Sequence, residues 1–352
     1  MKNTFKKIFA ILTVFVLVVS MFACSSSKST AVSSTPSKSN TSNAQKAAGK
    51  KYTIGYYGID STQAFFKDVY DGLNKACAKR GWTLKAEFTN YDPVKMSAAY
   101  NDFKAEHVDF IIDGNAMQDI SAPFAQKAAT DKIPYLAIAQ NLPAPTYNYG
   151  PANSDMGTAV GNYIGALAKK EWEGQIDLII LVGTFTTGPQ ITERLTSAVP
   201  VLGKYVQNIN SVPVIKVDAN AGDTQVVYQK VKDSLTSKPD AKHIAMFCQT
   251  DDMANAAFSA VSAAGRGEEV MGTGSDCSAV ATDYFKKAIV SNNFKVPWRG
   301  SIYLGAINYG EALCKIIPKI LNNQQKEYNI TFQPQVAGIY NLYTAIPSLK
   351  NK

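Results

Sequence analysis

Residues 176–183 read Ile-Asp-Leu-Ile-Ile-Leu-Val-Gly, a strand-length run that is apolar through most of its length. Such runs are typical of parallel strands that are covered on both faces. Similar β-rich runs recur from residue 52 onward, and stretches with the apolar spacing of helices separate them. This alternation predicts βαβ units, and therefore an α/β protein with parallel sheets.

The alternation occurs twice along the chain. The first series of expected strands covers residues 52–58, 83–89, 110–114 and 134–139, and the second covers 176–183, 212–219, 243–249 and 270–274. Between the expected strands at 83–89 and 110–114, Asp92-Pro93 is a typical helix start. The roughly 300 residues from Tyr52 onward exceed what one hydrophobic core usually holds. We therefore expect two doubly wound, Rossmann-like lobes.

The first 23 residues have the layout of a secretory signal peptide. Lys2, Lys6 and Lys7 precede an apolar run over residues 8–19, and Ala23 precedes Cys24. The run is short for a membrane span, which needs about 20 residues. The pattern resembles a bacterial lipoprotein signal, in which Cys24 becomes the lipid-carrying N-terminus. An ordinary signal peptide with a chance cysteine and an uncleaved anchor are the alternatives, and all three place the rest of the chain outside the cytoplasm.

Residues 24–51 are rich in Ser, Thr, Lys, Ala and Asn, and they predict a disordered linker between the lipid and the first lobe. No Asp or Glu occurs before residue 52, whereas eight of the 36 basic residues do. The remaining 28 basic residues balance 28 acidic ones, so the basic pI of about 9.0 belongs to the leader and linker. We therefore expect no nucleic-acid partner, and a protein anchored by its lipid at the extracytoplasmic face of the cell membrane.

The remaining cysteines, Cys77, Cys248, Cys277 and Cys314, form no CxxC motif and no cluster with histidine. They predict buried apolar positions rather than a metal site. The sequence contains no P-loop, GxGxxG fingerprint or GxSxG motif. We expect no cofactor and no enzymatic activity. A glycosidase that uses Asp113 and Asp276 as paired carboxylates is the catalytic alternative.

Ligands of open α/β sheets bind beyond the carboxyl ends of the strands. The side chains expected there are amides, carboxylates and aromatic rings, which suit a sugar. They are Phe65, Phe66, Asp113, Asn115, Gln140, Asn141, Asp218, Asn220, the residues 249–252, and Asp276.

Four short motifs extend this interpretation, in this order along the chain. They are Ser-Thr-Gln-Ala-Phe-Phe at 61–66, Asn-Ser-Asp-Met-Gly at 153–157, Gln-Thr-Asp-Asp-Met-Ala at 249–254 and Gly-Ser-Asp at 274–276. Together they resemble the ribose-type periplasmic binding proteins, the solute receptors of ABC importers, over essentially all of residues 52–352.

The resemblance implies a type I periplasmic binding protein fold, with two lobes joined by a three-segment hinge. Lobe one would cover residues 52–153 and 300–333, and lobe two residues 154–299 and 334–352. The chain would cross between them near Asn153, near 298–301 and near Pro334. The resemblance also adds Gln63, Asn153, Thr192 and Thr250 to the ligand site.

The sequence differs from the family at two positions where the family commonly has an arginine that hydrogen-bonds to the sugar. Gln140 stands at the end of the fourth strand, and Thr192 stands before Glu193-Arg194. We therefore expect Arg299, beside Trp298 at the hinge, to supply the cationic contact, with the Trp298 ring as a stacking plane. The alternative is that Arg299 only pairs with an acid across the hinge.

The function implied is a solute-binding lipoprotein that closes on a sugar or sugar-like polyol and delivers it to an ABC permease. A sugar-sensing co-receptor for a membrane histidine kinase or chemoreceptor has the same fold and is the alternative.

Overall fold

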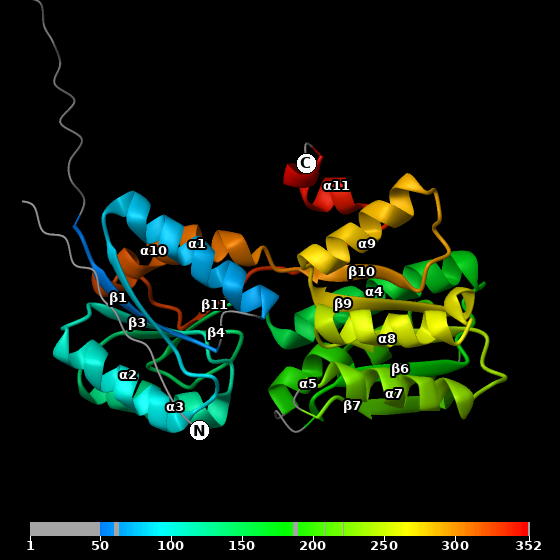
Figure 1. Ribbon diagram of the computed structural model, residues 1–352, viewed down its shortest axis with the longest axis horizontal. Coiled ribbons are helices and arrows are strands. Elements are labelled where there is room, and N and C mark those ends of the chain that lie inside the picture. The colour runs from blue at the N-terminus through cyan, green and yellow to red at the C-terminus, as the bar shows by residue number, and fades with distance from the viewer. Residues whose placement is uncertain (1–49, 60–62, 186–188, 208, 221, 351–352) are drawn as a thin grey trace, which may run out of the picture. The chain divides into compact units, whose positions relative to one another are not determined.

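The computed structural model describes residues 50–59, 63–185, 189–207, 209–220 and 222–350. The predicted signal peptide, Cys24 and most of the predicted linker lie outside the described residues. The described part contains two six-stranded sheets with helices around them, so the predicted α/β fold with two lobes is confirmed (Figure 1).

The sheet of the first lobe has the strand order β11-β5-β4-β3-β1-β2, and all its pairs are parallel. Its strands are β1 (Thr53–Gly58), β2 (Thr83–Phe88), β3 (Phe110–Asp113), β4 (Tyr135–Ile138), β5 (Tyr147–Tyr149) and β11 (Asn329–Ile330). Its helices are α1 (Ala64–Arg80), α2 (Pro93–Ala105), α3 (Gln118–Thr130) and α10 (Tyr309–Leu321). Helices α1 and α10 cover one face, and α2 and α3 cover the other (Figure 1).

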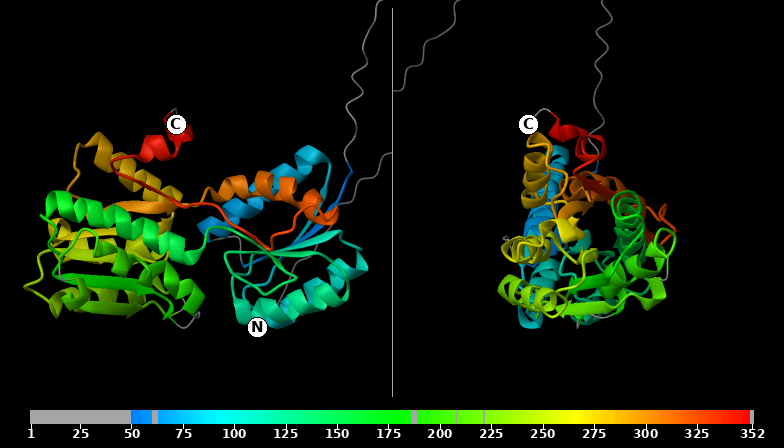
Figure 2. Two further views of the ribbon diagram at one scale, coloured as in Figure 1. Left: turned by 180° about the vertical axis from the view of Figure 1, so that it is seen from behind. Right: turned by 90° about the vertical axis from the view of Figure 1, so that its right-hand side faces the viewer.

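The sheet of the second lobe has the order β12-β10-β9-β8-β6-β7, in which only β12 is antiparallel to its neighbour among the described pairs. Its strands are β6 (Leu178–Gly183), β7 (Val214–Asp218), β8 (Ile244–Cys248), β9 (Val270–Asp276), β10 (Trp298–Tyr303) and β12 (Gln335–Gly338). Its helices are α4 (Asn153–Glu171), α5 (Pro189–Thr196), α6 (Ala198–Leu202), α7 (Thr224–Thr236), α8 (Asp251–Ala263), α9 (Ala279–Val290) and α11 (Leu342–Ala345). Helix α4 lies behind the sheet in Figure 1 and in front of it in Figure 2.

Both faces of each sheet are buried, as the apolar runs predict. In β8, Ala245 and Phe247 join the cluster that contains α4, whereas Ile244 and Met246 join the cluster formed with α7, α8 and α9. Because successive side chains of a strand point to opposite faces, one apolar run supplies two cores. The central strands therefore read as continuous apolar sequence.

Local sequence signals fix several helix ends. Asp92 accepts hydrogen bonds from the backbone N–H groups of Val94 and Lys95, which is the predicted N-cap of α2. Gly81 ends α1 with a φ of 65°, a conformation that glycine adopts without steric cost.

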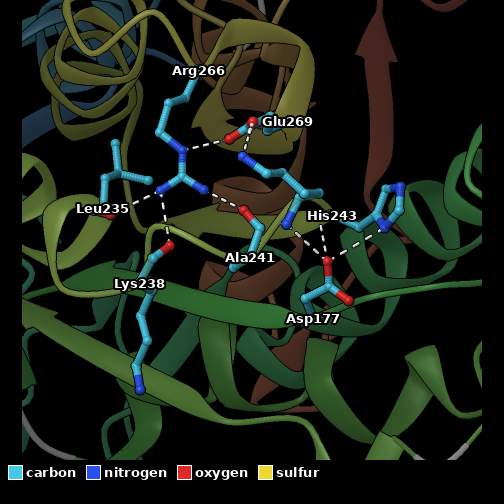
Figure 3. A network of polar contacts seen from close by, with 8 residues as sticks. Asp177, Leu235, Lys238, Ala241, His243, Arg266 and Glu269 are labelled. Atoms are coloured by element: carbon cyan, nitrogen blue, oxygen red, sulfur yellow. Dashed lines mark hydrogen bonds and ion pairs between the residues drawn. The ribbon is translucent and has the colours of Figure 1, made fainter.

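Arg266 binds the C-terminal end of α7 and the loop that follows it (Figure 3). Its guanidinium donates hydrogen bonds to the carbonyl oxygens of Leu235, Lys238 and Ala241, and it pairs with Glu269. One side chain therefore donates to a carbonyl group in the last turn of α7 and to two in the loop that follows, where helix carbonyls run out of intrahelical donors.

The four described cysteines have free thiols, and three of them are buried. The Sγ atoms of Cys77 and Cys314 are 3.9 Å apart, where α1 packs against α10.

The chain passes from the first sheet to the second after β5, returns to the first sheet after β10, and passes to the second sheet again after β11.

The return crossing lies later than the sequence predicts. Residues 300–303 were expected in lobe one, but they form β10 with Trp298 and Arg299 and pair with β9 and β12 in the second sheet. The physical reason is that the run Trp298–Tyr303 is buried almost throughout, and only the sheet can satisfy its backbone groups.

Candidate functional site: a cavity at the strand ends

The strand ends of both sheets border two adjoining cavities. The larger cavity has a volume of about 1260 Å³ and the smaller about 150 Å³, and they share Phe65, Ala139, Arg194 and Leu304. Among the predicted residues, those that line the larger cavity are Gln63, Phe65, Phe66, Gln249, Thr250, Asp251, Asp252 and Asp276. Gln140, Asn141 and Asn153 line the smaller one. Most of these residues were predicted from the rule that ligands bind beyond the carboxyl ends of strands.

Phe65 and Phe66 supply aromatic surface at the start of α1. Their rings meet edge to face with centroids 5.0 Å apart, and each residue is only 9% exposed. Phe65 also packs against Tyr309 at 5.6 Å and lines both cavities. Gln63, just before the helix, donates to the hydroxyl of Tyr91 over 3.4 Å, and both side chains line the larger cavity.

Arg194 on α5 is the cation of the site, and the sequence analysis did not select it. Its Nε donates to Oδ1 of Asn153 over 3.1 Å, and its Nη1 donates to the carbonyl oxygen of Gln249 over 3.2 Å. It lines both cavities. Burial lowers the pKa of the guanidinium, and the nearby Asp276 carboxyl opposes this shift. The sequence signal that pointed to Arg194 was its position in the Glu193-Arg194 pair. The prediction instead named Thr192, two residues earlier.

Asp276 ends β9 and presents its carboxyl group to the larger cavity. Burial raises the pKa of this carboxyl, the charge of Asp251 raises it further, and Arg194 lowers it. The residue has a φ of 110°, which L-residues rarely adopt. An arginine and a carboxyl group thus lie in the same site, and together they can donate to and accept from ligand hydroxyl groups.

Amides complete the lining. The Nε2 of Gln140 donates to Oδ2 of Asp113 and to Oγ of Ser121, each over 3.1 Å. Its buried Oε1 has no hydrogen-bond partner within the described part of the chain, so this acceptor is available to a ligand or a water molecule. Thr250 caps α8 by accepting from the N–H of Met253 over 3.3 Å.

Asp113 was expected in the ligand site, but the structure places it outside both cavities. Its side chain is fully buried and accepts hydrogen bonds from the N–H of Asn115, the hydroxyl of Tyr135 and the amide of Gln140. Burial raises the pKa of its carboxyl, and these donors oppose the shift. The glycosidase alternative requires Asp113 and Asp276 to line a common cavity, and in the structure they do not.

Trp298, Arg299 and Thr192 also lie outside both cavities. The Trp298 ring packs between Phe258 and Phe285 in the core of the second lobe, and its Nε1 donates to the carbonyl oxygen of Gly300. Both residues of the Trp298-Arg299 pair are buried because β10 is an inner strand of the sheet.

Arg299 pairs with Glu171 at the end of α4, over 3.0 Å. The alternative stated from the sequence was an acid across the hinge; the structure shows an acid partner, but Glu171 lies on α4 of the same lobe as Arg299. The carbonyl oxygen of Thr192 accepts from the hydroxyl of Thr196 within α5.

The described residues contain no group of three or more His, Cys, Asp or Glu side chains that could hold a metal ion. Among the same residues, no helix combines the length and the apolar character that a membrane crossing requires.

The comparisons with known proteins agree with this architecture. No curated protein matches the sequence. A solute-binding protein of an ABC transporter from Actinobacillus succinogenes 130z, solved with bound D-allose, superposes with a TM-score of 0.67 at 17% identity, over 82% of this chain and 98% of that one. The myo-inositol-binding protein of Caulobacter superposes with a TM-score of 0.67 at 16% identity, over 85% of this chain and 97% of that one.

At these identities the structural likeness shows the fold alone. The family assignment comes from the sequence: a model described as a periplasmic binding protein domain matches residues 54–324, which is most of the chain. The chain therefore belongs to the periplasmic binding protein domain family.

Proposed function

We propose that the protein is an extracytoplasmic receptor that binds a sugar or a sugar-like polyol at these strand ends and delivers it to an ABC importer. The observation that carries the proposal is the composition of the cavities: the aromatic Phe65, the guanidinium of Arg194, the carboxyl of Asp276 and the free Oε1 of Gln140. Aromatic faces pack against sugar rings, and the polar groups hydrogen-bond to hydroxyls. Similar folds carry D-allose and myo-inositol in their own sites.

The direct test is a thermal-shift screen of the purified protein, without its leader, against D-allose, myo-inositol, L-arabinose and glycerol. A ligand that binds the folded state stabilises it by RT ln(1 + [L]/Kd), which is about 2.7 kcal/mol at 100 times Kd. We expect at least one sugar or polyol to raise Tm, and the Asp276→Ala variant to lose most of this shift. A panel without any stabilising sugar or polyol would count against the proposal. Conversion of the bound sugar during incubation would favour an enzyme.

We further propose that Cys24 is the acylated N-terminus, which would hold the receptor near its membrane partner. The basis is the sequence around Cys24, because this segment lies outside the described residues. The Cys24→Ala variant should leave the membrane fraction and appear in the medium or periplasm. An uncleaved variant that still sediments with membranes would identify the leader as an ordinary anchor.

A further inference from the structure

Asp251, the first residue of α8, is buried and joins three elements of the second lobe. Its side chain is 1% exposed. Its Oδ2 accepts a hydrogen bond from the N–H of Ser278 over 2.6 Å, and its Oδ1 accepts from the hydroxyl of Ser301 over 2.6 Å. The carboxyl group therefore connects α8, the turn after β9, and β10.

The turn that Asp251 contacts is the one that carries Asp276. Asp276 and Cys277 have φ values of 110° and 50°, a region that side chains other than glycine rarely adopt and that costs on the order of 1–3 kcal/mol per residue. Such a turn persists only when its surroundings hold it. The N–H of Cys277 donates to Oγ of Ser301 over 3.0 Å, and the next N–H, of Ser278, donates to Asp251. Two consecutive amides beside Asp276 are thus fixed by one serine and one carboxyl group.

Gly274 shows how closely this carboxyl group approaches β9. A Cβ atom at this position would lie 2.2 Å from Oδ1 of Asp251, which is far inside van der Waals contact. Any residue other than glycine would displace the carboxyl group. The sequence Gly274-Ser275-Asp276 and the position of Asp251 therefore depend on each other.

We propose that Asp251 is a positioning residue, which with Ser301 holds the strained turn so that Asp276 faces the ligand. The proposal rests on the proposed function, in which Asp276 accepts hydrogen bonds from ligand hydroxyls. Asp251 borders the larger cavity, but the residue is only 1% exposed and its two oxygens accept from Ser278 and Ser301, so we assign it the holding of the turn and not a ligand contact.

The charges around Asp251 add a pH dependence. The pKa of the Asp251 carboxyl is raised to about 7, because burial and the charge of Asp252 raise it more than the hydrogen bonds from Ser301 and Ser278 lower it. Burial also raises the pKa of Asp276, and the charge of Asp251 raises it further. Cys248 and Cys277 face the same carboxyl group, and burial raises the pKa of both thiols. Arg194 is the cation that acts on Asp276.

The sign of the pH effect follows from Asp276. An ionised carboxylate is the stronger acceptor for hydroxyl groups, so the affinity for sugar should fall as the pH drops and Asp276 is protonated. In Asp251→Asn the neighbouring negative charge is gone, so the pKa of Asp276 falls and this loss of affinity moves to lower pH. A residue that only stabilises the lobe would lower Tm without moving the profile.

The experiment compares Asp251→Asn, Ser301→Ala and the control Asp283→Asn, which changes an exposed carboxylate on α9. D-allose and myo-inositol are titrated calorimetrically between pH 5 and pH 8.5. We expect Asp251→Asn and Ser301→Ala to bind about tenfold more weakly at pH 8, equivalent to about 1.4 kcal/mol. Only Asp251→Asn should shift the profile. The control should match the wild type.

Hydrogen–deuterium exchange of the peptide covering residues 276–279 gives a readout that needs no ligand. We expect faster exchange in both variants, because the N–H groups of Cys277 and Ser278 lose their acceptors or bind weaker ones. Faster exchange in a protein that binds no sugar would support the positioning role and reject the proposed function. If Asp251→Asn does not fold, Ser301→Ala decides by its affinity and exchange. Unchanged exchange in the folded variants, or an unshifted pH profile in Asp251→Asn, would overturn the proposal.

Discussion

The Nε of Arg194 donates a hydrogen bond to Oδ1 of Asn153 over 3.1 Å, and this contact joins α5 to the first residue of α4. Asn153 begins the second lobe directly after the chain leaves the first sheet, so the guanidinium is oriented by the first crossing segment. Its Nη1 is held by the carbonyl oxygen of Gln249. Arg194 is therefore oriented from two directions before any ligand arrives.

We predict that Arg194→Lys weakens sugar binding by about tenfold to a hundredfold. An ammonium group cannot reproduce two directed guanidinium bonds, and a hydrogen bond to a charged group contributes about 1.5–3 kcal/mol. Calorimetry of the sugar found in the thermal-shift screen measures the change. The matched control is Arg299→Lys, because Arg299 pairs with Glu171 outside both cavities. That variant should lower Tm and keep its affinity. The reverse pattern would return the cationic contact to Arg299.

A second prediction concerns the aromatic surface of the larger cavity. Phe65→Leu keeps an apolar side chain but removes the ring, so binding should weaken by a stacking-sized 0.5–1.5 kcal/mol, or roughly twofold to tenfold. Phe88→Leu is the control, because Phe88 packs edge to face on Tyr70 and lines neither cavity. Titrations of both variants distinguish loss of stacking from a general effect of losing a phenyl ring. Equal affinities in the two variants would remove Phe65 from the site.

The network in Figure 3 predicts a loss of stability without a loss of function. Arg266→Ala removes the guanidinium donor from the carbonyl oxygens of Leu235, Lys238 and Ala241, of which the first two keep a backbone N–H donor. It also removes one of the two cationic partners of Glu269, which keeps Lys242. We expect the free energy of unfolding to fall by roughly 2–4 kcal/mol. Denaturant unfolding measures this, and the affinity for sugar at 25 °C should not change. Wild-type stability would mean that water replaces the guanidinium at little cost.

The sequence predicts the long central strands well because a strand that is buried on both faces has to be apolar throughout. Strands β5 and β11 have only three and two residues, so no periodic pattern marks them. The start of β10 was assigned to a hinge because the family resemblance places a crossing near residues 298–301. Its arginine is paired 128 positions away in the chain, and no local pattern can show this.

The position of a site residue along the chain is easier to predict than the direction in which its side chain points. Thr192 and Arg194 are two residues apart on α5, so their side chains point about 200° apart around the helix axis. Choosing the wrong member of the pair selects the opposite side of the helix. Asp113 was placed correctly at a strand end, but three donors of its own lobe occupy its oxygens.

The last prediction tests whether Trp298 belongs to the core of the second lobe or to the ligand site. The sequence analysis expected the Trp298 ring to be a stacking plane for the ligand. In the structure the ring is fully buried among Phe258, Tyr284 and Phe285. Replacing it leaves a cavity and removes the hydrogen bond from Nε1 to the carbonyl oxygen of Gly300, so we expect a loss of roughly 2–5 kcal/mol in the free energy of unfolding. The folded fraction should bind sugar with wild-type affinity, measured well below the lowered Tm. A variant with unchanged Tm and weakened binding would show that Trp298 faces the ligand after all.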